Sequence, residues 1–110
     1  MTAPPMTVVE TERFLKDAEP LLGDSGRAEL VAFLGANPSA GEIMPQTGGV
    51  RKLRWALSGR GKRGGARVIY FYHSGDRPLY LLMVYAKARQ ENLTAEEKKA
   101  VRKLATILKN

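Results

Sequence analysis

The sequence predicts an α+β domain in which helices cover one small antiparallel sheet. Stretches rich in β-branched and aromatic residues recur between residues 50 and 87 and are separated by turn-forming residues. Apolar residues at helical spacing come before them, in residues 11–37, and after them, in residues 94–108. The chain has 110 residues and is 44% apolar, enough for one modest core. Residues 1–110 are therefore predicted to form a single domain.

A short strand and a helical hairpin are expected in the N-terminal part. Residues 1–5 are expected to be disordered, and the β-branched residues in 6–10 favour a strand. Thr11 can cap a first helix, which Pro20 should kink or break and Gly23 should end. A second helix should begin at Asp24 or Ser25 and end at Asn37-Pro38. The apolar residues predicted to pack on the sheet are Phe14, Ala18, Leu21, Leu22, Leu30, Val31 and Leu34.

Three consecutive strands are predicted in the middle of the chain. Residues 38–49 contain two Pro and three Gly, so we expect a loop there. Residues 50–57 follow as a strand, and residues 67–73 and 79–87 as two more. The second and third strands are apolar on both faces, as central strands are. Residues 74–78 should join them in a hairpin turn, which makes the three strands a meander.

Basic residues are concentrated in the second half of the chain. Residues 1–47 have a net charge of −4 and residues 48–110 a net charge of +11, for a total of +7. Side chains alternate along a strand, so Lys52 and Arg54 should share one face of the first meander strand while Arg51 lies on the other. Such segregated charge makes nucleic acid the leading partner class. A solvated basic surface without a partner is the alternative.

A basic, glycine-rich loop, GRGKRGGAR at residues 59–67, separates the first two meander strands. If the hairpin turn centres near residue 76, Arg67 lies opposite Tyr85, and Lys87 lies just past that pair at the end remote from the turn. The loop enters the hairpin at that same end. The cations predicted to converge there are Arg60, Lys62, Arg63, Arg67 and Lys87, with Arg89 as a further candidate. The alternative is that these long side chains splay separately into water.

A C-terminal helix is predicted after residue 92. The sequence TAEE at residues 94–97 is a capping box. Val101, Leu104, Ala105 and Leu108 make an apolar stripe that should pack on the sheet. The remaining face is basic, through Lys98, Lys99, Arg102, Lys103 and Lys109. We favour a solvated helix face over a contact with nucleic acid for these cations.

Several other classes of function find no support in the sequence. The chain has no cysteine, and its one histidine, His73, has no second histidine with which to bind zinc. We expect His73 next to the turn, away from the cationic end, and see no histidine or glutamate at that end that could act as a base. No Gly-Lys-Ser/Thr ends the glycine loop, so a nucleotide-binding phosphate loop is not supported. No apolar run approaches the roughly 18 residues of a membrane span, and a cytoplasmic protein without metal or cofactor is expected.

The residue pattern resembles the RelE/ParE superfamily of toxins, specifically its HigB-type branch. The resemblance is carried by GGVRKLR at residues 48–54, GRGKRGGARVIY at residues 59–70 and LLMVYAK at residues 81–87, in this order. The order strand, two helices, three strands, helix covers essentially the whole chain and agrees. The resemblance implies a RelE-like fold and a toxin of a type II toxin–antitoxin system that cleaves mRNA on the ribosome and inhibits translation.

The resemblance also implies roles for individual residues. Cleavage would proceed without metal, by attack of the ribose 2′-OH on the adjacent phosphate. Arg67 would stabilise the transition state, and Lys62 and Lys87 would transfer protons or neutralise charge. The residues implied to hold the RNA are Arg60, Arg63, Arg51, Lys52 and Arg54.

The partners implied are a cognate antitoxin, usually with a helix-turn-helix domain, the ribosome and mRNA, with operator DNA bound only through the antitoxin. Two alternatives stay open. Gyrase-blocking toxins use the same fold without cutting RNA, and a plain nucleic-acid-binding module would share the same cations.

Overall fold

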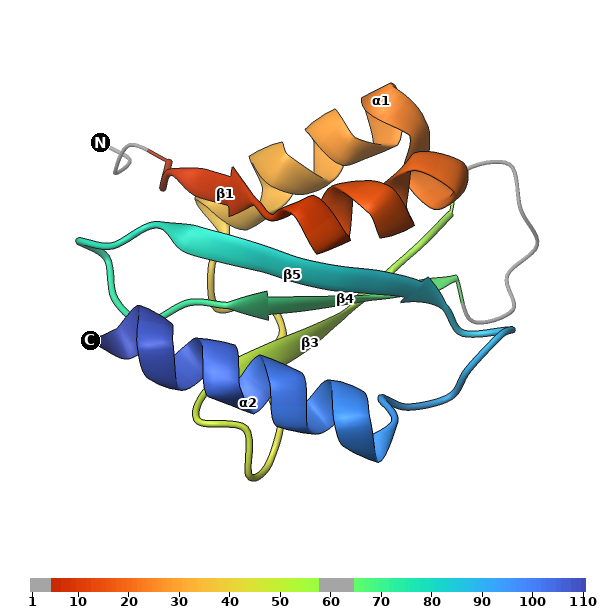
Figure 1. Cartoon of the computed structure of the whole chain (residues 1–110). Helices are drawn as coiled ribbons and strands as arrows, with labels where there is room; N and C mark the ends of the chain where they lie inside the picture. The colour runs from red at the N-terminus through yellow and green to blue at the C-terminus, as the bar shows by residue number, and fades with distance from the viewer. Residues whose placement is uncertain (1–4, 58–64) are drawn as a thin grey trace.

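A computed structural model describes residues 5–57 and 65–110. In this part of the chain a five-stranded sheet lies between two helical elements, α1 on one face and α2 on the other (Figure 1). The elements in chain order are β1 (Val8–Glu10), α1 (Glu12–Ala36), β2 (Glu42–Ile43), β3 (Val50–Trp55), β4 (Ala66–Phe71), β5 (Leu79–Ala86) and α2 (Ala95–Lys109). The predicted α+β class is confirmed.

The strands are arranged in the order β1-β5-β4-β3-β2. β3, β4 and β5 form the predicted antiparallel meander. Two features differ from the expected sheet. β1 pairs parallel with β5, so the sheet is mixed, and the two-residue strand β2 pairs with β3 inside the segment expected to be a loop. The β1–β5 and β2–β3 pairings each join two separate segments of the chain. The local sequence of a strand determines neither its partner nor its direction relative to that partner.

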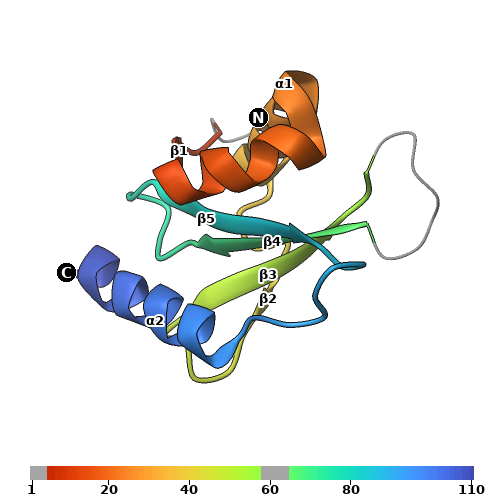
Figure 2. The same cartoon turned by 45° about the vertical axis from the view of Figure 1, so that its right-hand side comes forward.

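The predicted helical hairpin is confirmed as α1, which a break at Gly23 divides into two segments. Gly23 has φ of +67° and ψ of −179°, a combination that glycine adopts without strain. The helical backbone continues through Pro20, so Gly23 alone ends the first segment. The second segment turns back beside the first in both views (Figure 2). At the start of α1, the Thr11 hydroxyl oxygen accepts a hydrogen bond from the Phe14 N–H and also donates to the Leu81 carbonyl, which ties the helix to β5.

The core is divided between the two faces of the sheet. Phe14, Leu30 and Leu34 of α1 pack on one face with Tyr70 and Leu81. On the other face, Val101 and Ala105 of α2 pack against buried strand residues, which are Val50, Ile69, Phe71, Leu82 and Met83. All residues of β4 are buried, as predicted for a central strand.

The apolar stripe of α2 is narrower than predicted. Val101 and Ala105 are buried and Leu108 is partly buried, but Leu104 is 41% exposed. Leu104 is displaced around the helix from the line that Val101, Ala105 and Leu108 direct at the sheet, so its assignment to the buried stripe was wrong.

The predicted capping box at the start of α2 is confirmed. The Glu97 N–H donates to the Thr94 hydroxyl oxygen at 3.1 Å, and the Thr94 N–H donates to the Glu97 carboxylate at 2.9 Å. Gln90 donates to the same carboxylate, and Arg13 of α1 lies 3.5 Å from it. Burial raises the pKa of Glu97, but these hydrogen bonds and the Arg13 charge together outweigh burial and hold the pKa below its ordinary value.

Glu97 is therefore expected to stabilise the fold in a pH-dependent way. Because its pKa is depressed in the folded state, its contribution is present above the unfolded pKa of about 4.3 and is lost as the pH falls through the folded pKa. Gln can keep the capping-box hydrogen bonds and removes only the charge, so Glu97→Gln should cost about 0.3–1 kcal/mol at pH 7, and the difference from wild type should shrink at pH 3. Urea denaturation at both pH values measures this, with the exposed neighbour Glu96→Gln as control. A Glu97→Gln deficit of equal size at both pH values contradicts the assignment.

Candidate nucleic-acid interface

An open cleft of about 510 Å³ lies on the α2 side of the sheet, at the end remote from the hairpin turn. Arg67 lies two residues from Ile69 on β4, so both face the side that α2 covers, but α2 begins only at Ala95 and leaves this end of the face open. The residues that line the cleft are Ala40, Glu42, Lys52, Leu53, Arg54, Arg67, Lys87, Glu91 and Asn92.

The strand register brings the cations of this cleft together. Arg54 lies opposite Arg67 in the β3–β4 pair, and Arg67 lies opposite Tyr85 in the β4–β5 pair, as predicted. Directly opposed residues of antiparallel strands point to the same face. A β-bulge between Ile69 and Tyr70 shifts the register by one residue; without it Arg67 would face Val84. The bulge therefore sets which β5 residue lies next to Arg67.

Arg67 is buried, with only 6% of its surface exposed, rather than splayed in water. Its guanidinium donates to the Ala66 carbonyl at 3.3 Å. The neighbouring phenol of Tyr85 is also buried, and its oxygen makes no hydrogen bond within the described ranges. Burial raises the pKa of Tyr85, while the positive charge of Arg67 acts in the opposite direction. Tyr85 is thus a buried, uncharged neighbour of the positively charged Arg67.

Lys87 is held beside Arg67 by the backbone. Its N–H donates to the Gly65 carbonyl at 3.0 Å, which continues the β4–β5 pairing by one step beyond Ala86. Gly65 has φ of +53°, and a Cβ there would lie 2.6 Å from the Trp55 carbonyl oxygen. Only glycine fits at this point, where the chain enters β4. Lys52, Arg54, Arg67 and Lys87 thus converge in one cleft, where their mutual repulsion favours an anionic ligand.

The chain matches a known toxin family over more than half of its length. The family model described as "RelE toxin of RelE / RelB toxin-antitoxin system" matches residues 39–110. The chain belongs to the RelE toxin family. The matched segment contains every residue that lines the cleft.

The RelE fold extends over most of the chain. The structure is similar to that of a double arginine-to-alanine mutant of the E. coli toxin RelE in the free state, with a TM-score of 0.55 and 17% identity. The similarity covers 79% of this chain and 88% of the E. coli chain. The predicted RelE/ParE superfamily is confirmed, while the HigB-type branch stays a prediction.

Not every cation predicted for the RelE-family site lies in the cleft. Arg60, Lys62 and Arg63 lie outside the described residues. Arg51 lies on the opposite face from Lys52 and Arg54, as the strand alternation predicts. It donates to the carbonyls of Ser39 and Gly41, at 3.3 and 2.8 Å, and stands 6.0 Å from the centre of the Tyr72 ring. Arg51 therefore holds the backbone of residues 39–41 in place through these hydrogen bonds.

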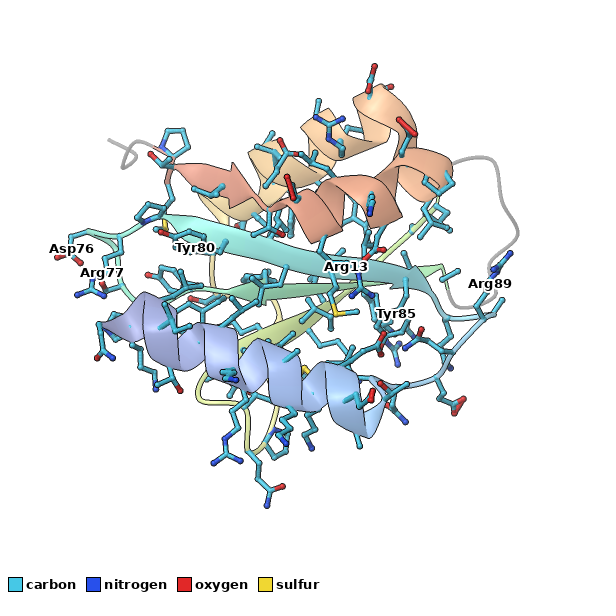
Figure 3. The ribbon with its side chains drawn as sticks, viewed as in Figure 1. Arg13, Asp76, Arg77, Tyr80, Tyr85 and Arg89 are labelled. Atoms are coloured by element: carbon cyan, nitrogen blue, oxygen red, sulfur yellow. The ribbon has the colours of Figure 1, made fainter. Side chains whose placement is uncertain are left out.

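The remaining two candidates, Arg89 and His73, lie away from the cleft lining. Arg89 is exposed on the connection after β5 and points outward (Figure 3). His73 lies at the turn end of the sheet, exposed and stacked on Phe71 at 6.2 Å between ring centroids.

Two glutamates line the cleft, contrary to our expectation that this end of the sheet has none. Glu42 reaches it because β2 pairs with β3 and places Glu42 opposite Lys52. Glu91 reaches it because the connection from β5 to α2 folds back over the sheet end. Glu91 follows Lys87 by only four residues in the sequence, and this proximity could have suggested that Glu91 lies in the same cleft. Nothing local to the 38–49 segment indicated that Glu42 belongs to a strand.

The cations of the cleft can bind a phosphate, and its carboxylates can accept a proton. The described residues hold no cluster suited to a metal ion. Across residues 5–57 and 65–110, no three histidine, aspartate, glutamate or cysteine side chains gather to hold one. No helix in the same ranges is long and apolar enough to cross a membrane.

Proposed function

We propose that this RelE-family protein is the toxin of a type II toxin–antitoxin system that cleaves mRNA on the ribosome and so inhibits translation. The observation that carries the proposal is the convergence of the buried Arg67 with Lys52, Arg54 and Lys87 in one cleft. Four cations and two glutamates line the cleft, and a net positive charge in a cleft with low-dielectric walls concentrates a polyanion there. The proposal takes the polyanion to be RNA, because the resemblance to ribonuclease toxins implies an RNA substrate.

In the proposed reaction, the 2′-oxygen of a ribose attacks the adjacent phosphorus while the bond to the following 5′-oxygen breaks. The products are a 2′,3′-cyclic phosphate and a free 5′-hydroxyl, so no metal or water is consumed. Negative charge grows on the non-bridging oxygens in the transition state. In the proposal Arg67 stabilises this charge, and its burial supports the role because a guanidinium that is already fixed needs no reorganisation when the charge develops.

Two proton transfers complete the reaction. The 2′-hydroxyl must lose a proton, and Glu42 and Glu91 are carboxylates within the cleft that can accept one. Lys62 is the candidate for this role that family resemblance suggests. The leaving 5′-oxygen must gain a proton, and the Lys87 ammonium is placed to supply it or to neutralise its charge. Lys52 and Arg54, with Arg60 and Arg63, would hold the RNA backbone on either side.

The proposal includes the partners typical of the family. A cognate antitoxin, with a helix-turn-helix domain, would neutralise the toxin and contact operator DNA, and the ribosome would present the mRNA. The cell compartment would be the cytoplasm. The family description names a toxin–antitoxin system and supports the antitoxin directly.

Induced expression in a bacterial host tests the proposal. We expect translation to stop within minutes and primer extension to reveal new 5′ ends in cellular mRNA. A supercoiling assay run beside it addresses the alternative, a toxin that blocks DNA gyrase without cutting RNA. Gyrase inhibition with intact mRNA favours that alternative, and unaffected growth favours a plain nucleic-acid-binding module.

A further inference from the structure

The cleft continues into a trough along one flank of α2. A second depression, of about 320 Å³, shares Glu42, Lys52 and Asn92 with the cleft. A third, of about 210 Å³, shares Lys98 with the second and is lined by Gln46, Ala95, Lys98, Lys99 and Arg102. α2 and the connection between β2 and β3 lie side by side here in both views (Figures 1 and 2). The second and third depressions together are called the α2 trough.

Positive charge follows the α2 trough from end to end. Lys52 stands at its start, Lys98 in its middle, and Lys99 and Arg102 at its far end. Lys98 and Arg102 are four residues apart, so they lie one above the other on the helix surface. Glu42 is the one acidic residue that lines the trough in the described part of the chain, and it lies at the end that joins the cleft.

The middle of the α2 trough is apolar. Ile43, Met44, Pro45 and Leu93 line it, and Ile43 is 59% exposed. Single exposed aliphatic side chains are common on protein surfaces, but here four apolar residues lie together between Lys52 and Lys98, so the trough offers apolar contact area beside its cations. Apolar surface between spaced cations matches a single-stranded nucleic acid, which presents phosphates and base faces alternately.

We propose that the α2 trough binds the RNA strand that is cut in the cleft, over several nucleotides beyond the scissile phosphate. This inference rests on the proposed function, because it extends the same strand from the same site. Lys98, Lys99 and Arg102 neutralise successive phosphates, and the Ile43–Leu93 surface packs against the bases between them. The basic residues of α2 thus include a substrate-binding flank, in place of the merely solvated face that the sequence favoured.

Binding of uncleavable RNA tests the α2 trough. Fluorescence anisotropy with 2′-O-methyl oligonucleotides of 3 and 12 nucleotides, over a series of salt concentrations, compares Lys99→Gln/Arg102→Gln with wild type. Both residues are exposed, so the fold should survive their substitution. The control is Lys16→Gln, which removes one exposed positive charge from α1, and Arg102→Gln alone is the trough variant matched to it in charge.

We expect the trough variant to lose affinity for the 12-mer alone. Its slope of log K against log salt should become shallower by about 1.4, about 0.7 for each phosphate that is no longer neutralised. Binding of the 3-mer, and the control variant with either oligonucleotide, should match wild type.

Two results overturn the inference: no change with the 12-mer, or an equal loss of affinity with both lengths. Cleavage by wild type is scored separately. Normal mRNA cleavage with an unchanged 12-mer slope rejects the trough and leaves the proposed function standing. A shallower slope without any mRNA cleavage supports the trough and rejects the nuclease.

Discussion

Arg67→Ala is expected to reduce mRNA cleavage by about 100- to 1000-fold, the cost typical of removing one fixed donor to transition-state charge. Arg67 is 6% exposed and its cleft is at the edge of the core, so its charge acts through a low dielectric. Arg67→Lys keeps the charge but loses the planar guanidinium, so its activity should fall between those of Arg67→Ala and wild type. Primer extension on mRNA after expression of each variant measures the effect.

The control for this prediction is Lys16→Ala, which removes one positive charge from an exposed position on α1. It should cleave as wild type does. Circular dichroism and thermal melting must show that Arg67→Ala is folded, because Arg67 is itself buried. A folded Arg67→Ala protein with wild-type cleavage would remove Arg67 from the reaction and, with it, the main support for a nuclease in this cleft.

Tyr70→Phe is expected to destabilise the protein by about 1–3 kcal/mol, because it leaves buried polar groups without partners. The Tyr70 hydroxyl accepts a hydrogen bond from the Gly41 N–H and donates one to the Pro38 carbonyl, both at 2.8 Å. Tyr70 is fully buried, so water cannot replace these bonds without rearrangement. Urea denaturation at neutral pH measures the loss.

The same substitution should weaken RNA binding, because Tyr70 anchors the segment that leads into β2. Ala40 and Glu42 of that segment line the cleft. Tyr80→Phe is the control, since Tyr80 lies on β5 near the opposite, hairpin end of the sheet (Figure 3). If Tyr70→Phe and Tyr80→Phe lose the same stability and the same affinity, the hydroxyl of Tyr70 does not hold the cleft wall.

Local pattern was enough to predict the meander and the end of the sheet at which Arg67 lies. The turn at residues 74–78 and the apolar runs on either side placed Arg67 opposite Tyr85, and the structure has this pair. Near the turn, however, the observed register is shifted by one residue from the predicted register, since Tyr70 pairs with Leu81. The register shift at Ile69/Tyr70 brings the strands back to the predicted register, in which Arg67 pairs with Tyr85. A bulge leaves no clear mark in such an apolar run, so the agreement depended on a feature that the pattern did not reveal.

Contacts between distant segments decided the rest of the site. Glu42 enters the cleft only through the two-residue strand β2, which Tyr70 and Arg51 hold in place from the other face of the sheet. Leu104 shows the same limit on α2, where helical spacing alone did not reveal how the helix is rotated on the sheet.

Local sequence was sufficient for the α+β class, the helical hairpin with its break at Gly23, the capping box of α2 and the alternation that separates Arg51 from Lys52 and Arg54. Each depends on the periodicity or backbone preference of a few neighbouring residues, which short-range sterics and hydrogen bonding settle. Long-range packing was needed to bring Glu42 and Glu91 into the same cleft as Arg67 and to continue that cleft along α2. Those proximities join segments far apart in the chain, and they exist because the whole core packs in one way.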